Sequence, residues 1–247
     1  MRVVFLGTNG WYDNRAGNTI CVLIECGDRY VVLDAGNGIH KMDAALQKRK
    51  PVDLFLSHFH LDHIVGLHTL VRLDLSAGLR IFGQAGAREA LGNILRQPYT
   101  VPLGEMPFKA GVFELPDERA LAPYLKDVRP LVHAAPCIGF RFEIEGRTIA
   151  YCTDTGMCSN LIELGRGADL LITECSALDG QRRDSWPHLS PQDAVAVARE
   201  TQAKRVALVH FNASLYPTVE SRVAVQEQVA READNIIVAF DDMVLEL

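Results

Sequence analysis

Short apolar runs separated by turn residues predict β-strands in the first quarter of the chain. Gly27-Asp28 is a hairpin turn signal between two of these runs. After the fourth run, apolar residues recur at helical spacing from Asp62 to about Ala77, which predicts a helix. The expected strands are residues 3–6, 20–25, 30–33 and 53–56.

The rest of the chain repeats this alternation of strands and helices. Prolines between positions 98 and 124 predict a loop-rich segment with short strands. Gly146-Arg147 predicts a second hairpin turn. Ser190 is a suitable N-cap for the helix expected at residues 191–200. Strands followed by helices in both halves predict layered α/β packing, in one sheet or in two stacked sheets. The further strands are expected at residues 79–82, 139–145, 148–152, 170–173, 206–209, 236–240 and 243–247, and the further helices at residues 87–95, 191–200 and 219–232.

The composition is that of a globular protein with an ordinary core. Of the 247 residues, 48% are hydrophobic and 23% are charged, and no apolar run reaches the roughly 18 residues of a membrane span. The apolar start at residues 1–7 is too short for a secretory signal, so we expect a cytoplasmic protein. None of the six cysteines forms a C-x-x-C pair, which favours buried, reduced thiols over a zinc ribbon.

The charge balance argues against a long nucleic-acid partner. The chain has 25 basic and 31 acidic side chains, a net charge of −6, whereas binding to phosphate backbones usually needs a basic surface. The densest basic runs are Lys48-Arg49-Lys50 and Arg182-Arg183.

Three of the eight histidines, His58, His60 and His63, fall within six positions together with Asp62. Side chains alternate along a strand, so His58 and His60 can point the same way from a strand end. Imidazole and carboxylate groups suit zinc, and also manganese or iron. If the segment were a solvated loop, four ionisable groups after a buried strand would lack partners. The segment therefore predicts a metal centre.

The segment from Ser57 to Leu67, with the sequence SHFHLDHIVGL, resembles the signature of the metallo-β-lactamase superfamily. The resemblance extends over nearly the whole chain. It implies a four-layer αββα sandwich that forms a single domain over residues 1–247, with metal ions at one edge of two facing sheets. It also implies a later histidine, a bridging acidic residue and a final histidine, for which His133, Asp154 and His210 follow apolar runs in this order.

Carried onto this sequence, the resemblance implies two divalent metal ions, zinc or alternatively manganese or iron. A bridged pair lowers the pKa of a shared water and makes hydroxide available as the nucleophile. Asp62 would then orient or deprotonate this water, and an aspartate bridge points to the phosphodiesterase and thioesterase branches. One ion is expected on His58, His60 and His133, the other on Asp62, His63 and His210, with Asp154 bridging them.

Further segments resemble the ribonuclease Z group, which trims transfer-RNA precursors. The resemblance implies a proton relay in which His188 protonates the leaving oxygen and Glu174 orients His188. Alternatively, His188 only precedes the helix that begins at Pro191. The segments are Phe5-Leu6-Gly7-Thr8, Leu33-Asp34-Ala35-Gly36, Leu171-Ile172-Thr173-Glu174-Cys175 and Pro187-His188-Leu189-Ser190.

Two departures from that group argue against tight binding of transfer RNA. Ribonuclease Z enzymes carry a long flexible arm, often between the ligands that match His133 and Asp154, and here only 21 positions separate these residues. The group's basic residue soon after the last ligand is missing from residues 211–216. We therefore expect a phosphodiesterase for a small or cyclic nucleotide or a short RNA, with ribonuclease Z activity as an alternative.

Other functions are compatible with the same motif. The metals could hydrolyse a carbon ester, thioester, lactone or lactam, which the Glu174/His188 pair disfavours. Redox chemistry at a di-iron site would need a partner flavin domain, for which 247 residues leave no room. A non-catalytic protein that only kept the fold would not be expected to keep a complete set of metal ligands. Trp11 and Tyr12 could stack a base of the substrate or equally belong to the core or an interface. The resemblance to the ribonuclease Z group is also compatible with a homodimer, because dimers are common in that group.

Overall fold

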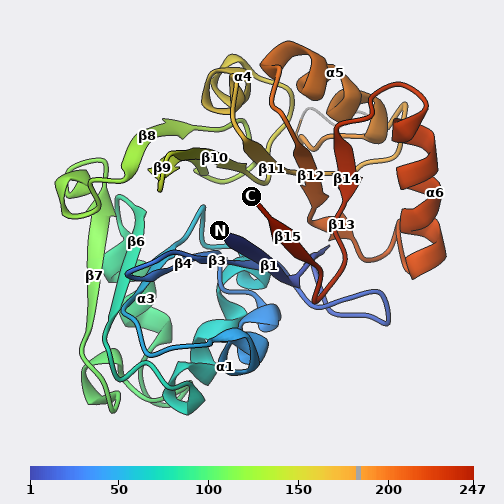
Figure 1. Ribbon diagram of the computed structural model, residues 1–247. Helices are drawn as coiled ribbons and strands as arrows, with labels where there is room; N and C mark the ends of the chain where they lie inside the picture. The colour runs from blue at the N-terminus through green and yellow to red at the C-terminus, as the bar shows by residue number, and fades with distance from the viewer. Residues whose placement is uncertain (182–184) are drawn as a thin grey trace.

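The computed structural model describes residues 1–181 and 185–247, so the Arg182-Arg183 run lies outside the described residues. Two sheets face each other, and helices cover the outer face of each, as Figure 1 shows. The four layers are those expected from the sequence, and the strands form two stacked sheets rather than one.

The first sheet contains both ends of the chain. It has the order β15-β1-β3-β4-β5-β6-β7. The strands from β4 to β7 are parallel, whereas β1 is antiparallel to both β15 and β3, and β3 is antiparallel to β4. The bounds are β1 (Arg2–Gly7), β3 (Cys21–Glu25), β4 (Tyr30–Leu33), β5 (Val52–Phe55), β6 (Leu79–Gln84), β7 (Ala110–Leu115) and β15 (Val244–Glu246).

The second sheet has the order β14-β12-β11-β10-β9-β8. The hairpin turn predicted at Gly146-Arg147 lies one residue earlier, at Glu145-Gly146. Both of these residues have positive φ, at 51° and 74°, and Arg147 already belongs to the next strand. A separate two-stranded ribbon pairs β2 with β13 in parallel. The bounds are β8 (Leu125–Pro130), β9 (Ile138–Ile144), β10 (Arg147–Cys152), β11 (Leu170–Glu174), β12 (Val206–Val209), β14 (Ile236–Val238), β2 (Asn9–Gly10) and β13 (Phe211–Asn212).

The helices are short in the first half of the chain and longer in the second. Ser190 caps α5 as predicted, because its side chain accepts a hydrogen bond from the backbone of Asp193, and the Asp193 side chain bonds back to the Ser190 backbone. The α-helices are α1 (Met42–Ala45), α2 (Leu61–Ile64), α3 (Ala87–Ile94), α4 (Ser159–Gly165), α5 (Pro191–Thr201) and α6 (Val219–Ala230). The 3₁₀-helices are η1 (Asn37–Lys41), η2 (Val65–Arg72), η3 (Leu103–Glu105) and η4 (Arg119–Leu121).

The prediction of a single helix from Asp62 to about Ala77 is wrong. The chain forms one turn of α-helix, α2, and continues as the 3₁₀-helix η2, which ends at Arg72. Gly66 explains the change, because its N–H bonds to the carbonyl of Ala35, and a Cβ there would lie 2.2 Å from the carbonyl oxygen of Gly36. The backbone is therefore held against the loop after β4 instead of continuing a regular α-helix.

Parallel strands in both sheets end at the same edge of the sandwich, and this arrangement places the site. Aromatic side chains such as Phe55 and Phe140 fill the space between the sheets, with ring centroids 5.6 Å apart. At the edge, Asp34 follows β4, His58 follows β5 and Asp154 follows β10. Polar side chains from distant parts of the sequence therefore meet there.

All six cysteines are free thiols, and all but the partly exposed Cys158 are buried. Among the described residues, no helix has both the length and the apolar character needed to cross a membrane.

Candidate metal centre

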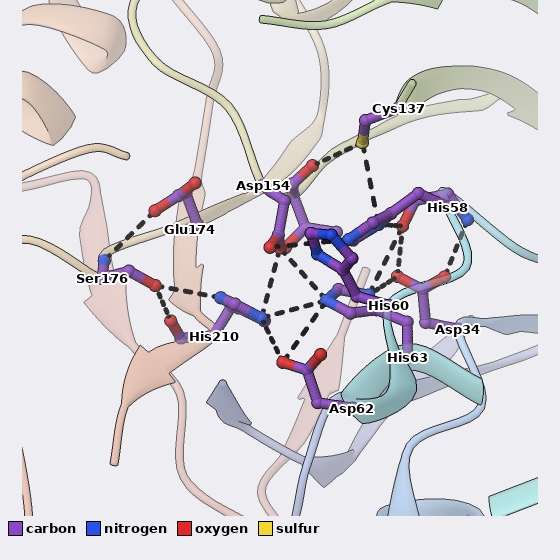
Figure 2. A network of polar contacts seen from close by, with 12 residues as sticks. Asp34, His58, His60, Asp62, His63, Cys137, Asp154, Glu174, Ser176 and His210 are labelled. Carbon is purple, nitrogen blue, oxygen red and sulfur yellow. Dashed lines mark hydrogen bonds and ion pairs between the residues drawn. The ribbon is translucent and has the colours of Figure 1, made fainter. Parts of the chain in front are cut away.

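Three residues that follow parallel strands have left-handed backbones. Asp34, Asp154 and His210 have φ of 57°, 55° and 54°, although this region disfavours residues other than glycine. Such a conformation costs of the order of 1–3 kcal/mol per residue and is typical of functional sites. Here it follows the end of β4, β10 and β12, where each side chain enters the polar cluster drawn in Figure 2.

The predicted ligand residues form two adjacent groups of donor atoms. Within each group, one donor atom from every residue lies within 4.8 Å of the others. The first group comes from the loops after β5, β8 and β10, and the second from α2 and the end of β12. The groups are His58, His60, His133 and Asp154, and Asp62, His63 and His210.

Asp154 lies between the two groups, with one carboxylate oxygen toward each (Figure 2). Its Oδ1 is 3.3 Å from Nε2 of His63 and 3.2 Å from Nε2 of His210. Its Oδ2 is 3.8 Å from Nε2 of His58 and also 3.8 Å from Nε2 of His133. A carboxylate in this position can contact ions in both groups at once.

Hydrogen bonds on the far side of three imidazole rings engage Nδ1, so that Nε2 of each ring faces the cluster. His63 Nδ1 lies 2.8 Å from Asp34 Oδ2, and His58 Nδ1 lies 3.0 Å from Ser57 Oγ, whose own proton goes to Asp34. His210 Nδ1 lies 2.9 Å from Ser176 Oγ, whose proton goes to a backbone carbonyl. Each Nδ1 is thus the donor, and each Nε2 presents a lone pair to the site.

A buried nitrogen without a partner indicates that this donor set fits a cation. Nε2 of His58 faces Asp154 at 3.8 Å, is buried and has no hydrogen-bond partner among the described residues. Buried polar atoms normally have a partner, so an exception calls for an explanation such as a bound ion. Imidazole nitrogen and carboxylate oxygen are ligands of zinc and similar ions.

The electrostatics of the cluster also favour a positive charge. Burial lowers the pKa of His58 to about 2, so its ring is neutral and can bind a metal. Burial acts in the same direction on His63, but the carboxylates of Asp154 and Asp34 outweigh it and raise the pKa of His63 well above its ordinary value. These carboxylates therefore attract a cation, which a divalent ion would supply.

Glu174 and His188 form a pair beside the second group. Nδ1 of His188 lies 2.7 Å from Glu174 Oε1, and the buried carboxylate also accepts the backbone N–H of Thr155 at 2.6 Å. Burial acts to lower the pKa of His188, but the charge and hydrogen bond of Glu174 prevail and raise it to about 9. A ring nitrogen of His188 lies within 4.8 Å of ligand atoms of Asp154 and His210.

The two aromatic residues singled out in the sequence lie at cavities beside the cluster. Trp11 lines a cavity of about 300 Å³ that also exposes Asp62, Asp154 and His210. Tyr12 lines an adjoining cavity of about 400 Å³, together with Trp11. Both side chains are about half exposed, so neither belongs to the core.

Sequence reasoning assigned no role to Asp34, Ser57, Ser176 and Trp186, which the structure places around the cluster. Asp34 could have been found, because it follows an apolar strand in the same manner as Asp154. The two serines have no such signal, since their contacts with His58 and His210 depend on the tertiary fold.

A buried cluster of imidazoles and carboxylates at the open edge of an αββα sandwich defines a metal-dependent hydrolase. Residues 29–211 match the family model described as the beta-lactamase superfamily domain, and the chain belongs to this superfamily.

Individual relatives resemble the chain over almost its whole length. A ribonuclease Z from Pyrococcus abyssi is 25% identical, with 99% of this chain and 98% of the relative covered. The crystal structure of the metallo-β-lactamase fold protein YhfI from Bacillus subtilis has a TM-score of 0.79 at 20% identity, covering 99% of this chain and 98% of that one. The short form of human tRNase Z has a TM-score of 0.72 at 25% identity, covering 100% and 99%.

Proposed function

We propose that this protein is a dinuclear metal-dependent phosphodiesterase that acts on a small or cyclic nucleotide or a short RNA. The observation that carries the proposal is the Glu174–His188 pair beside two donor groups, the second of which also contacts Asp154 of the first. Donors of this kind suit two divalent ions, and a positioned acid suits a reaction with an alkoxide leaving group.

The proposed metal ligands are the residues of the two donor groups. Zinc is the proposed ion because it favours neutral imidazole and carboxylate ligands, although manganese and iron accept the same set. When bound, such a pair of ions lowers the pKa of a water molecule and neutralises charge on the phosphodiester. One ion would be held by His58, His60 and His133, the other by Asp62, His63 and His210, with Asp154 bridging them.

Protein groups provide the proton transfers. Asp62 Oδ2 accepts the backbone N–H of Trp11 at 2.7 Å, which holds the carboxylate so that it can orient the attacking water and take its proton. The Glu174 carboxylate accepts a hydrogen bond from Nδ1 of His188, so Nε2 of the same ring is available to the substrate. His188 then gives a proton to the leaving oxygen.

The cavities at the cluster suit a small substrate. Their volumes, about 300 and 400 Å³, are within the range of sites for small ligands, roughly 300–1,000 Å³. No lysine or arginine is found among the described residues that line them, and the net charge is −6. The described lining and the net charge therefore favour a small substrate over a long polyanion, whose binding usually needs a basic surface.

Ribonuclease Z activity is the second candidate, because the relative from Pyrococcus abyssi has that name. Its alignment spans 306 positions although this chain has 247 residues, so the relative has residues without a counterpart here. Between His133 and Asp154 this chain holds only the β9–β10 hairpin. That hairpin is too short to be the arm expected of a transfer-RNA-binding member.

A substrate panel tests the proposal. Zinc-reconstituted protein is expected to hydrolyse bis(p-nitrophenyl) phosphate and 2′,3′-cyclic AMP with a kcat/KM at least about tenfold above that for a lactone or nitrocefin. Two cations favour the anionic phosphodiester in both substrates, and the proton donor also assists the alkoxide leaving group of cyclic AMP. Initial rates are measured on one preparation of known metal content, with a transfer-RNA precursor included.

The panel separates the alternatives. Preference for the lactone or nitrocefin in the same metallated sample would contradict a phosphodiesterase. Efficient trimming of the transfer-RNA precursor, above the rate on cyclic AMP, would favour the second candidate.

A further inference from the structure

Both tryptophans of the chain lie side by side next to the metal-ligand groups. The rings of Trp11 and Trp186 are stacked, with centroids 5.7 Å apart, and Trp186 also stacks on His60 at 5.5 Å. Trp11 nevertheless remains 52% exposed. A large apolar ring held at a cavity instead of in the core indicates a binding surface.

The backbone around Trp11 is held by the proposed metal ligands. Trp11 has a φ of 72°, which a bulky residue rarely adopts, and its N–H donates to Asp62 Oδ2. A Cβ on Gly10 would lie 2.5 Å from Cε1 of His210, so this loop packs directly on that ring. The fully buried Arg222 donates to the side chain of Thr8 at 2.9 Å and supports the start of the loop. The backbone that carries the Trp11 ring therefore has a defined position relative to the predicted metal ligands.

The cavity of about 400 Å³ has flat walls and polar edges. The tryptophan rings and Tyr12 line it, and Asn212 and Ser214 add hydrogen-bonding groups. Asn212 Oδ1 accepts the backbone N–H of Ser214 at 2.9 Å, whereas its Nδ2 has no partner within the described part of the chain. A planar ring that stacks on tryptophan and has polar atoms at its edge matches this lining.

The position of His188 relates this cavity to the reaction. His188, Trp11 and Trp186 are walls of both this cavity and the smaller one that exposes Asp62 and Asp154. A group bound in the larger cavity thus lies next to the residue proposed to protonate the leaving oxygen.

We propose that the larger cavity binds a planar aromatic ring carried by the leaving alcohol of the phosphodiester, so that the substrates are phosphodiesters of nucleosides or of other alkyl alcohols that carry an aromatic ring. The assignment of the ring to the leaving side rests on the proposed phosphodiesterase function. In the reaction, water oxygen bonds to phosphorus, and the bond from phosphorus to the nucleoside oxygen breaks. That oxygen takes a proton from His188, and the proton of the water passes to Asp62.

Adenosine binding tests the cavity without turnover. Because both tryptophans line the cavity, adenosine is expected to quench the intrinsic fluorescence of the zinc-loaded protein in a saturable manner, and ribose is not. In isothermal titration calorimetry, Trp11→Ala should weaken adenosine binding about tenfold to a hundredfold, because a stacking face is lost. Trp11→Phe should retain most of the affinity. Tyr99→Ala is the matched control, since Tyr99 is 70% exposed and lines neither cavity.

The methyl diester of adenosine 5′-phosphate tests the orientation. Its expected products are adenosine and methyl phosphate, whereas methanol and adenosine 5′-phosphate would place the ring on the opposite side and overturn the assignment.

Further outcomes separate this inference from the function on which it rests. Hydrolysis of bis(p-nitrophenyl) phosphate without adenosine binding overturns the ring site alone. Adenosine binding without hydrolysis of any phosphodiester overturns the proposed function and the leaving-group assignment with it. If Trp11→Ala changes the oligomeric state in light scattering but not adenosine affinity, the surface is a subunit interface and the inference is wrong.

Discussion

Replacing Asp154 by asparagine is expected to lower kcat/KM for bis(p-nitrophenyl) phosphate by about a thousandfold or more. The Asp154 carboxylate has one oxygen toward His63 and His210 and the other toward His58 and His133. Asparagine keeps the volume but offers one neutral carbonyl oxygen, so it cannot bridge ions in both groups. Steady-state kinetics and elemental analysis of the purified variant measure turnover and metal content together.

The matched control is Asp117→Asn, which changes an exposed aspartate in the turn after β7. It should leave both quantities unchanged. Circular dichroism should show that Asp154→Asn is folded. A folded Asp154→Asn protein with the metal content and turnover of the parent would contradict the bridging role.

Replacing His188 by alanine is expected to lower kcat for 2′,3′-cyclic AMP by about 10²–10⁴-fold, the usual contribution of a general acid. Cyclic AMP releases an alkoxide, which needs a proton, whereas bis(p-nitrophenyl) phosphate releases a stable phenolate. The loss on the second substrate should therefore be much smaller. The ratio of the two losses, measured by steady-state kinetics on one preparation, separates proton donation from a structural effect.

His68→Ala provides the matched control, because His68 is an exposed histidine whose Nδ1 contacts only the nearby carbonyl of Val65. It should be as active as the parent on both substrates. Equal losses on both substrates in the His188 variant would show that His188 supports the fold of the site without donating a proton.

Most of the predicted ligand residues come at or just after a recognisable strand end, whereas Asp62 and His63 lie on α2. His58 and His60 follow the apolar run of β5, and Asp154 and His210 follow β10 and β12. Alternation along a strand and the shared edge of parallel strands are local rules that need no knowledge of the partner strands. These rules indicate how His58 and His60 lie, whereas the choice of His133, Asp154 and His210 and the division into two metal sites came from the resemblance to the metallo-β-lactamase superfamily.

Features that depend on contacts between distant segments could not be predicted in the same way. The change from α-helix to 3₁₀-helix at residue 65 follows from the close approach of Gly66 to the loop after β4, 30 positions earlier. The tautomers of His63 and His210 are set by Asp34 and Ser176, which are remote in sequence. Periodicity within one segment contains no information about such contacts.

The cavity that the two tryptophans line illustrates the same limit. Trp11 was singled out from its place in the sequence, but the choice between base stacking and burial needs its neighbours. Trp186 lies 175 positions away, and no local pattern relates the two rings. Their stacking beside the metal-ligand groups is a tertiary property.

Zinc titration of chelator-treated protein tests whether two metal ions are needed for catalysis. Bound zinc and hydrolysis of bis(p-nitrophenyl) phosphate are measured on the same samples. We expect no hydrolysis without metal and a plateau of activity at about two ions per chain, as for a two-metal site. Full activity in the metal-free protein, or two bound ions without any phosphodiester hydrolysis, would contradict this expectation.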